Sequence, residues 1–374
     1  MTAGVSDFLL VTHTNWSEAP RIRHQVARLL LDAGHRVHFL ERPRGPMASG
    51  MQVRAGDRPG LNVVSRRELL HRQLRVLPIL DRMNASFVER ELRSAATLLG
   101  LPDGVRIVNF ASDYWFLRRT FPGSRITTII HDDFEALCRL PYRGHVTAAL
   151  RRTCLESDDV LAVSEPLRRR LSQWCNAELF LPWSIVPYRA PAAAQGRDTL
   201  LFWGFIDRSL DVELIGRLST HLAQTRPSWR IELVGPTASR RRGRVIAPLS
   251  ALGNVAIRGQ TDLDDLPMDR CAAAIMPYRS TPIVNAVTLA NKSMQLLARG
   301  MPLLISAMPS FVQEPFVFRL DGPGGIERGI RACEASFDAV QPVIRAFLAA
   351  NSPASRLRQL GVEPAGSERP GPAL

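Results

Sequence analysis

The feature that most constrains the fold of this chain is a repeated alternation of short apolar runs with longer amphipathic segments. Its first copy has apolar runs at residues 8–11 and 36–40, separated by an amphipathic segment that begins after Pro20 and ends at Gly34. Proline near the start and glycine just past the end of a segment are typical of a helix. A strand, a helix and a second strand in this order predict a parallel pair, because a parallel connection has to cross back over the sheet.

The same alternation runs through both halves of the chain, with an interruption between them. Further apolar runs of the first half lie at 105–110, 126–130 and 160–163. Those of the second half lie at 199–204, 230–236, 254–259, 272–277 and 302–305. A chain of 374 residues is long enough for two cores of ordinary size. We therefore predict an α/β protein in which two Rossmann-like domains face each other across a cleft.

Composition indicates where the domains begin and end. The stretch 188–198 is rich in Pro, Ala and Gly and has no apolar period, so it is expected to link a first domain at 1–187 to a second at 199–335. One more helix is expected at 336–350. Residues 351–374 are rich in Pro, Gly, Ser and Arg with almost no apolar content, and we expect them to form a disordered tail.

The chain is strongly basic. Lys and Arg number 48 against 35 Asp and Glu, a formal net charge of +13, and almost all of the cations are Arg. A basic surface suits phosphate-bearing partners, although a preference for Arg codons would produce the same balance. No helix-turn-helix, zinc-finger or RNP pattern is present, so we expect no nucleic-acid partner.

The cysteines and the apolar runs bear on the compartment. The five cysteines form no CxxC pair and no metal-ligand spacing, so we expect neither a disulfide framework nor a metal site. The N-terminus lacks a signal-peptide pattern, and the apolar runs are far shorter than a bilayer span. We expect a cytoplasmic protein. The basic amphipathic stretch 66–93 predicts either peripheral contact with the anionic inner face of the plasma membrane or a helix pair packed on its own sheet.

Two loops of the second half are candidate ligand-binding loops, because open parallel sheets bind ligands at the carboxyl ends of their strands. The first loop runs from Gly204 through Phe205 to Arg208: the glycine permits close approach of the backbone, and the guanidinium can hold a phosphate. An ordinary strand end with a solvated arginine is the alternative. The second begins with Tyr278 and Arg279, which offer an aromatic face and a cation.

The stretch Asn291–Gln295 is the centre of the candidate site. Lys292 and Gln295 lie three residues apart, on one face of an expected helix near its N-terminus. A cation, an amide and the positive end of a helix dipole then converge on one spot. This combination suits a diphosphate and the hydroxyls of a ribose.

The spacing K-x-x-Q-x-x-x-x-G-x-P from Lys292 to Pro302, downstream of Pro277-Tyr278, resembles the donor motif of GT-B glycosyltransferases. The resemblance is greatest to bacterial exopolysaccharide transferases of the xanthan glucuronosyltransferase type, and more distant to the GT4 family. It implies that Lys292 meets the phosphates of a nucleotide-sugar, with a UDP-sugar favoured, and that Gln295 meets the ribose. It also implies a saccharide or lipid-linked acceptor, cell-surface polysaccharide synthesis, and no metal or other cofactor.

One departure from the GT4 pattern bears on the mechanism. GT4 enzymes usually carry Glu-x7-Glu in this region, whereas this chain has Val287 and Gln295. The missing first Glu favours an inverting enzyme. It also leaves open an inactive GT-B-like protein that binds a nucleotide-sugar or a partner enzyme.

An inverting transferase needs a base on the acceptor side, and the run 126–130 ends in candidates for it. His131, Asp132 and Asp133 follow this run, and paired carboxylates can raise one another's pKa. The xanthan-type resemblance implies that Asp132 is the base, with Asp133 as the second candidate. Capping of the next helix is the alternative use of either aspartate.

The loop after the first apolar run carries His13, Trp16 and Arg21. It lacks G-x-G-x-x-G, so a dinucleotide site has little support. In GT-B proteins this loop faces the acceptor, and the resemblance therefore implies that these three residues and His131 lie on the acceptor side. Ordinary loop polarity explains the same residues equally well.

Overall fold

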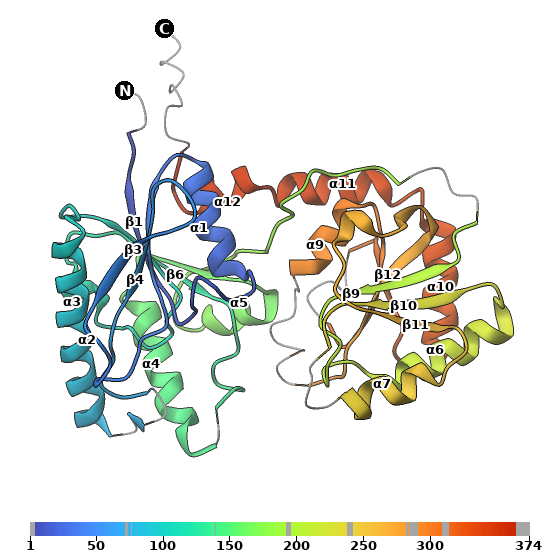
Figure 1. The fold of residues 1–374 in the computed structure, drawn as a ribbon, viewed down its shortest axis with the longest axis horizontal. Helices are drawn as coiled ribbons and strands as arrows, with labels where there is room; N and C mark the ends of the chain where they lie inside the picture. The colour runs from blue at the N-terminus through green and yellow to red at the C-terminus, as the bar shows by residue number, and fades with distance from the viewer. Residues whose placement is uncertain are drawn as a thin grey trace, which may run out of the picture. The chain divides into compact units, whose positions relative to one another are not determined.

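The chain forms two compact units. The computed structural model describes residues 4–71, 74–75, 77–138, 140–191, 196–237, 242–281, 284, 291–308 and 314–363. Unit 1 consists of Met1–Leu181 with Pro353–Leu374, and unit 2 of Pro182–Ser352 (Figure 1). Each unit contains its own mainly parallel sheet and its own helices, as the alternation in the sequence predicts.

Unit 1 has an eight-stranded sheet in the order β3-β4-β2-β1-β5-β6-β7-β8. Its strands are β1 (Asp7–Val11), β2 (Arg36–Leu40), β3 (Gln52–Ala55), β4 (Leu61–Ser65), β5 (Arg106–Asn109), β6 (Ile126–Ile130), β7 (Asp159–Ala162) and β8 (Ala177–Leu179). β3 is antiparallel to β4, and the other neighbours pair in parallel. The central strands are mostly buried because both faces of the sheet are covered.

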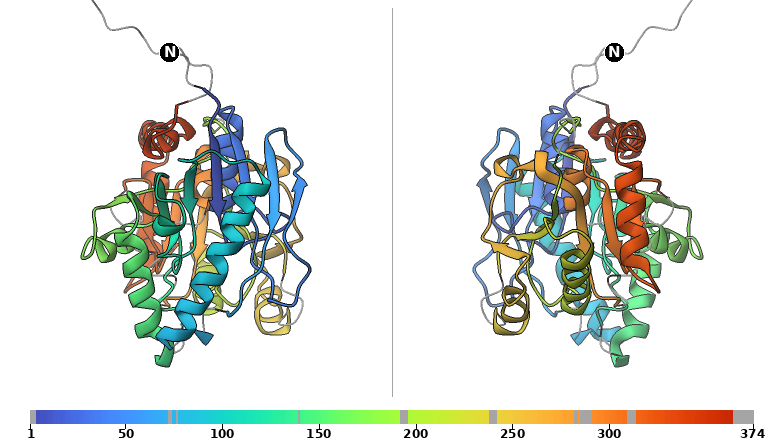
Figure 2. Two further views of the ribbon diagram at one scale, coloured as in Figure 1. Left: turned by 90° about the vertical axis from the view of Figure 1, so that its left-hand side faces the viewer. Right: turned by 90° about the vertical axis from the view of Figure 1, so that its right-hand side faces the viewer.

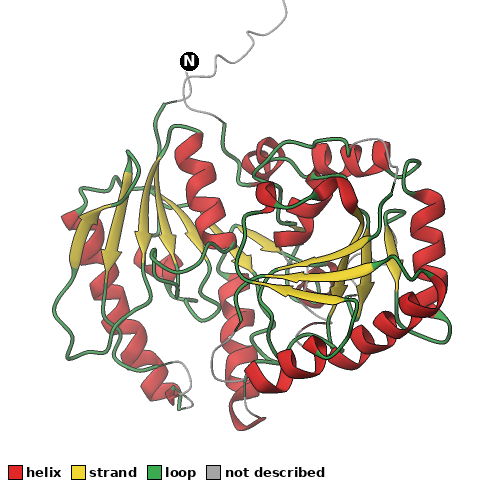
Figure 3. Cartoon of the chain, turned by 45° about the vertical axis from the view of Figure 1, so that its right-hand side comes forward, coloured by secondary structure: helices red, strands yellow, loops and turns green. Residues whose placement is uncertain are grey.

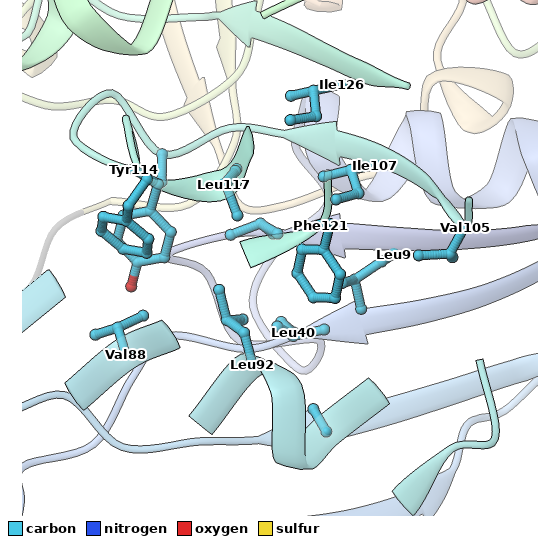
Figure 4. Close-up of a cluster of buried hydrophobic side chains, with 14 of the residues drawn as sticks. Leu9, Leu40, Val88, Leu92, Val105, Ile107, Tyr114, Leu117, Phe121 and Ile126 are labelled. Atoms are coloured by element: carbon cyan, nitrogen blue, oxygen red, sulfur yellow. The ribbon is translucent and has the colours of Figure 1, made fainter. Parts of the chain in front are cut away.

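The helices of unit 1 follow the strands in turn. They are α1 (Ile22–Asp32), α2 (Pro78–Leu98), α3 (Leu117–Thr120), α4 (Arg143–Leu155), α5 (Glu165–Leu171) and α12 (Pro353–Gln359), with a short 3-10 helix at Leu140–Tyr142. Val88 and Leu92 of α2 pack in one apolar cluster with Leu9 of β1, Leu40 of β2 and Ile107 of β5 (Figure 4). Burial of such side chains contributes roughly 1.5–3 kcal/mol each, so this face fixes α2 to the sheet.

Unit 2 has a six-stranded, fully parallel sheet in the order β11-β10-β9-β12-β13-β14. Its strands are β9 (Thr199–Trp203), β10 (Arg230–Val234), β11 (Val255–Arg258), β12 (Cys271–Pro277), β13 (Leu303–Ser306) and β14 (Val317–Arg319). Its helices are α6 (Val212–Thr225), α7 (Arg242–Ser250), α9 (Asn291–Ala298), α10 (Gly325–Ser336) and α11 (Gln341–Ala350), with 3-10 segments at Leu263–Asp265 and Met268–Arg270. Figure 3 shows these strands side by side with helices around them.

Each sheet has a point at which the strand order reverses. In unit 1, β1 lies between β2 and β5, and in unit 2, β9 lies between β10 and β12. The loops that leave the carboxyl ends of such strands diverge to opposite faces and open a crevice, which is where ligands bind in sheets of this kind. The predicted loops after residues 204 and 278 therefore leave the strands that flank the reversal in unit 2.

The predicted linker at 188–198 requires correction. The chain passes from unit 1 to unit 2 after Leu181, and the following residues already belong to unit 2. The Tyr188 hydroxyl donates to Oε1 of Gln341 (2.9 Å), and the backbone N–H of Arg189 donates to the carbonyl of Ala298 (2.7 Å). Such contacts hold 188–191 against unit 2, and 192–195 lie outside the described residues.

The predicted disordered tail at 351–374 also requires correction. Residues 353–359 form α12, which belongs to unit 1 and lies beside α1 (Figures 1 and 2). Leu357, Leu360 and Val362 are buried there, and Arg106 donates to the Leu360 carbonyl (2.8 Å). Three apolar side chains were enough to dock a segment whose overall composition is polar, and 364–374 lie outside the described residues.

The expected helix at 336–350 corresponds to α11, preceded by a separate helix α10. Within the described ranges, no helix is both long enough and apolar enough to cross a membrane.

Candidate functional site

The candidate site in unit 2 is built on a glycine at the end of β9. Gly204 has φ +147°, and its N–H donates to the carbonyl of Val234 (2.8 Å). The side chain of Lys292 lies against this glycine, because a Cβ added to Gly204 would stand 2.5 Å from the lysine Nζ. The helix α9 thus places its lysine directly over the end of the central strand.

A second glycine, which the sequence analysis did not single out as a ligand, supports the first. Gly235 follows β10, has φ +150°, and packs so closely that a Cβ would overlap the carbonyl of Gly204. Two neighbouring strands each followed by glycine are visible in the sequence, but their contact depends on the register of β9 against β10. Together the two glycines allow close approach of the two loop backbones and of the Lys292 side chain.

Lys292 is the only lysine in the sequence. Its Nζ lies 4.0 Å from the centre of the Phe202 ring and 4.9 Å from that of Tyr278. Burial lowers the pKa of Lys292 to about 7, against an opposing effect of the Asp207 carboxylate. No carboxylate in the described part of the chain forms an ion pair with it, so an anion bound here would gain a charge-assisted hydrogen bond.

Of the expected exposed pair Tyr278 and Arg279, Arg279 is exposed but Tyr278 is not. Tyr278 is buried under Lys292, and its carbonyl accepts a hydrogen bond from Ser306 Oγ (2.8 Å). Burial raises the pKa of its phenol. Nε of Arg279 donates to the carbonyl of Leu210 (3.0 Å). Both residues therefore support the site and hold its loops together.

The loop after Gly204 leaves two candidate ligands accessible. Phe205 and Arg208 are exposed, whereas Asp207 accepts hydrogen bonds from the backbone N–H and the hydroxyl of Ser209 (2.9 and 2.5 Å). Asp207 was not recognised in the sequence as part of the site. Its carboxylate raises the pKa of Lys292 and so opposes the effect of burial.

Gln295 lies one turn after Lys292 and is largely buried, with Oε1 3.3 Å from the hydroxyl of Ser184. Ser293, which follows Lys292 in the sequence, is fully buried. Its hydroxyl has no partner among the residues that the structure describes. Val287, the position of the missing Glu, lies outside the described residues.

The two aspartates after β6 in unit 1 have different environments. Asp133 is buried, accepts from the Ala136 backbone N–H (3.0 Å) and pairs with Nη1 of Arg170 (2.9 Å). These are the contacts of a turn-capping, ion-paired carboxylate. The side chain of Asp132 is 36% exposed and lies 3.8 Å from Nε2 of His131. Of the two candidates, Asp132 is the one that a substrate can reach.

His131 is buried between the rings of Phe110 and Phe134 (centroids at 5.9 and 5.2 Å). Its Nδ1 lies 3.4 Å from the Ile129 carbonyl, and its Nε2 contacts the guanidinium of Arg23. Burial, followed by the charge of Arg23, holds the pKa of His131 well below its usual value. The imidazole is therefore neutral, with Nε2 as an acceptor occupied by arginine. Arg23 was missed in the sequence because its partner lies 108 residues away.

The predicted acceptor-side residues of the first loop separate into two groups. Trp16 is held by internal contacts: its Nε1 donates to Asp57 (3.0 Å), and its ring packs against His24 and Phe39 (5.3 and 5.1 Å). His13 meets Tyr114 edge-on at 5.5 Å, and Arg21 is exposed at the start of α1.

Metal binding is a separate question for this site. Over the ranges that the structure covers, no three His, Cys, Asp or Glu side chains gather closely enough to hold a metal ion.

No protein-family model matches the chain, and no curated protein matches it. Solved structures do. A sucrose-phosphate synthase from Thermosynechococcus elongatus has a TM-score of 0.66 at 16% identity, over 95% of this chain and 98% of its own. An α,α-trehalose-phosphate synthase (UDP-forming) from Burkholderia xenovorans, in complex with glucose-6-phosphate, has a TM-score of 0.66 at 11% identity, over 96% and 100%. An E. coli structure described as trehalose-6-phosphate bound with UDP-2-fluoro glucose has a TM-score of 0.62 at 13% identity, over 94% and 97%.

These neighbours are GT-B glycosyltransferases, and the similarity extends over nearly the whole chain. The chain therefore has the GT-B fold, as predicted from the sequence.

Proposed function

We propose that this protein is a glycosyltransferase that moves a sugar from a nucleotide-sugar, with a UDP-sugar favoured, to a saccharide or lipid-linked saccharide acceptor in cell-surface polysaccharide synthesis. The observation that carries the proposal is the single lysine of the chain, held on a glycine backbone at the strand-order reversal of a GT-B unit. The neighbours with UDP in their descriptions favour that nucleotide.

The donor side of the proposed reaction uses electrostatic stabilisation. As the bond between the sugar C1 and the diphosphate breaks, negative charge grows on the leaving phosphate, and the Lys292 ammonium and the N-terminus of α9 stabilise it. Arg208, exposed in the adjacent loop, supplies a second cation. Gln295 binds the ribose, and the mechanism requires no metal.

On the acceptor side, Asp132 acts as general base in an inverting transfer. Its carboxylate takes the proton of the acceptor hydroxyl, whose oxygen forms the new bond to C1 while the nucleoside diphosphate leaves. His131 is not a competing base, because Arg23 occupies its Nε2 and its pKa is well below the usual value. Partial exposure of Asp132, in contrast to Asp133, supports this assignment.

The first experiment pairs the two aspartates. Purified protein is screened for thermal stabilisation by UDP, other nucleoside diphosphates and nucleotide-sugars, and then for transfer.

Asp132→Asn should bind the donor like the wild type with turnover reduced by about 10²-fold or more. Asp133→Asn should lose about 1–3 kcal/mol of stability while its folded fraction stays active. Normal turnover in Asp132→Asn would reject the base, and absence of any nucleotide-sugar binding would reject the proposed function.

A second experiment tests inversion. The anomeric configuration of the product is followed by proton NMR during the first turnovers, and inversion is expected. One structural neighbour is described as a trehalose-6-phosphate synthase studied for glycosyltransfer with retention, with a TM-score of 0.53 at 13% identity. A retained configuration here would therefore eliminate Asp132 as a base while leaving the transferase assignment intact.

Peripheral attachment to an anionic membrane belongs to the same proposal. Around the start of α2, Leu74, Leu77, Ile79 and Met83 are all more than half exposed. Arg82 is exposed among them and forms no ion pair within the described ranges. The opposite face of α2 packs on the sheet, as the second interpretation of this stretch predicts, and the exposed face supports the proposal of membrane contact. Apolar side chains beside an exposed arginine suit a bilayer interface with anionic lipids.

Vesicle sedimentation tests this attachment. Protein should co-sediment with vesicles that contain phosphatidylglycerol and much less with neutral vesicles. The double change Leu77→Ser and Ile79→Ser should abolish binding. Leu98→Ser is the matched control, since Leu98 is equally exposed at the other end of the same helix. Membrane attachment would be rejected if Leu98→Ser lost vesicle binding to the same extent, or if the wild type did not bind vesicles.

A further inference from the structure

A buried guanidinium without a carboxylate partner lies at the acceptor side of unit 1. Arg23, in the first turn of α1, is 7% exposed. Its one hydrogen-bond contact is to neutral His131, and its Nε has no partner in the described part of the chain. No described carboxylate forms an ion pair with it. Burial of a cation is costly unless an anion or several hydrogen bonds compensate it.

The groups around Arg23 are also mostly basic. The charges of Arg21 and Arg42 disfavour its charged form, and those of Asp132 and Glu18 favour it. Arg42 is neutralised by Glu18 (2.7 Å), whereas Arg21 is exposed and forms no ion pair with any described residue. Burial, the largest effect, lowers the pKa of Arg23 to about 10, still far above neutrality. Among the carboxylates, Asp132 raises the pKa of Arg23 most, and Glu18, which pairs with Arg42, raises it less.

The backbone adds to this potential. Arg21 and Arg23 lie at the N-terminus of α1, and the first turn of that helix contains no acidic residue. The helix dipole therefore places partial positive charge where the two guanidinium groups already are. The helix begins in the loop after β1, at the strand-order reversal of unit 1.

We propose that Arg21, Arg23 and the N-terminus of α1 form a subsite for an anionic group, a phosphate or a carboxylate, carried by the acceptor saccharide. The acceptor of the proposed transferase is then an acidic sugar or a sugar phosphate and not a neutral glycan. This inference rests on the proposed function.

The position of the subsite relative to the base agrees with this role. The guanidinium of Arg23 contacts Nε2 of His131, and the same nitrogen lies 3.8 Å from Oδ2 of Asp132. Both groups thus meet the same imidazole nitrogen, so an anion held by Arg23 would lie close to the base. His131, neutral and fixed by two aromatic rings, holds the Arg23 guanidinium in this position.

Binding of three small probes to the full chain tests the subsite: glucose 6-phosphate, glucuronate and glucose, each titrated by calorimetry. The wild type should bind one or both acidic probes about tenfold or more tightly than glucose. Arg23→Gln should remove that preference and Arg23→Lys should retain part of it. Arg28→Gln is the matched control, because Arg28 lies on the same helix over Trp16 and outside the subsite. It should bind all probes like the wild type.

The outcomes separate the subsite from the proposed function. Preference for glucose 6-phosphate alone assigns a phosphate-bearing acceptor, and preference for glucuronate alone assigns a uronate. Arg23→Gln should bind UDP like the wild type, because the donor site lies in unit 2. Lys292→Ala should lose UDP binding, and this result tests the donor site independently of the subsite. If Arg23→Gln does not fold, the variant Arg21→Gln, at an exposed position, should still lower the affinity for the acidic probes by about threefold or more. Equal binding of all three probes, or a preference that persists in both variants, would overturn the inference.

Discussion

Lys292 stands alone in a chain in which every other basic side chain apart from histidine is arginine. A primary ammonium is compact enough to lie against the rings of Phe202 and Tyr278 over a glycine. Its pKa responds to burial, whereas a guanidinium stays charged. Substitution by arginine would keep the charge but would not fit the same space.

The pKa of Lys292 predicts how donor affinity changes with pH. Below pH 7 the amine of the free protein is protonated and a diphosphate binds without further cost. Above pH 7 the amine is neutral before binding, so affinity for UDP should fall by about tenfold per pH unit until the pKa of the complex is reached. Calorimetric titrations between pH 6 and 9 measure this slope. NMR of the protein after reductive ¹³C-methylation reports the pKa of its single lysine directly. A pKa near the ordinary value with pH-independent affinity would contradict the prediction.

The two glycines of the donor site should respond differently to alanine. In Gly235→Ala the new Cβ overlaps a backbone carbonyl at a positive φ, so stability should fall by about 3 kcal/mol or more. In Gly204→Ala the nearest atom is the movable end of Lys292, so the protein should lose less stability but most of its UDP affinity. Urea denaturation measures the stability of the two variants, and UDP titration measures their affinity. If both variants lost stability and UDP affinity to the same extent, the proposed packing of Lys292 on Gly204 would be refuted.

At the scale of elements, the short helix α12 packs on unit 1, whose other elements lie far earlier in the sequence. Gln359 donates to the Leu179 carbonyl (2.9 Å), and Nε2 of His35 lies 2.9 Å from the carbonyl of Glu363. These contacts close unit 1 with residues from both ends of the sequence.

Truncation after Ser352 should therefore destabilise unit 1. Loss of Leu357, Leu360 and Val362 removes burial worth roughly 1.5–3 kcal/mol for each side chain. Truncation after Glu363 keeps all three and serves as the control. Differential scanning calorimetry should show a lower melting temperature for the first variant only. Identical melting of both variants would mean that α12 adds nothing to unit 1.

At the scale of the whole molecule, the two units differ in continuity. Unit 2 is one uninterrupted segment with its own six-stranded sheet, whereas unit 1 is assembled from two segments. The fragment 182–352 should therefore fold alone and bind UDP with an affinity within about threefold of the full chain. Circular dichroism and calorimetry of the fragment test this, with Lys292→Ala in the fragment as the control. A fragment that folds but does not bind would place part of the donor site in unit 1.

Local patterns in the sequence were sufficient for the strands that flank both reversals and for α11, whereas the roles of Gly204 and Lys292 stay predictions. These depend on short-range periodicity and on which residues follow a strand. The hairpin of β3 and β4 was not predicted, because β3 is short and mostly exposed and so lacks an apolar run. The helix α12 was not predicted either, because the stretch 351–374 has a polar composition and no apolar run.

What the sequence determined by itself is therefore the alternation of strands and helices, the two parallel sheets that follow from it, and the loops at which chemistry should occur. The tertiary structure alone decided which residues in those loops are buried and which are paired. It buried Tyr278 under Lys292, engaged Asp133 with Arg170, and joined Arg23 to His131 across 108 residues. The physical reason is that burial and pairing depend on the register between strands far apart in the chain, and no local pattern encodes that register.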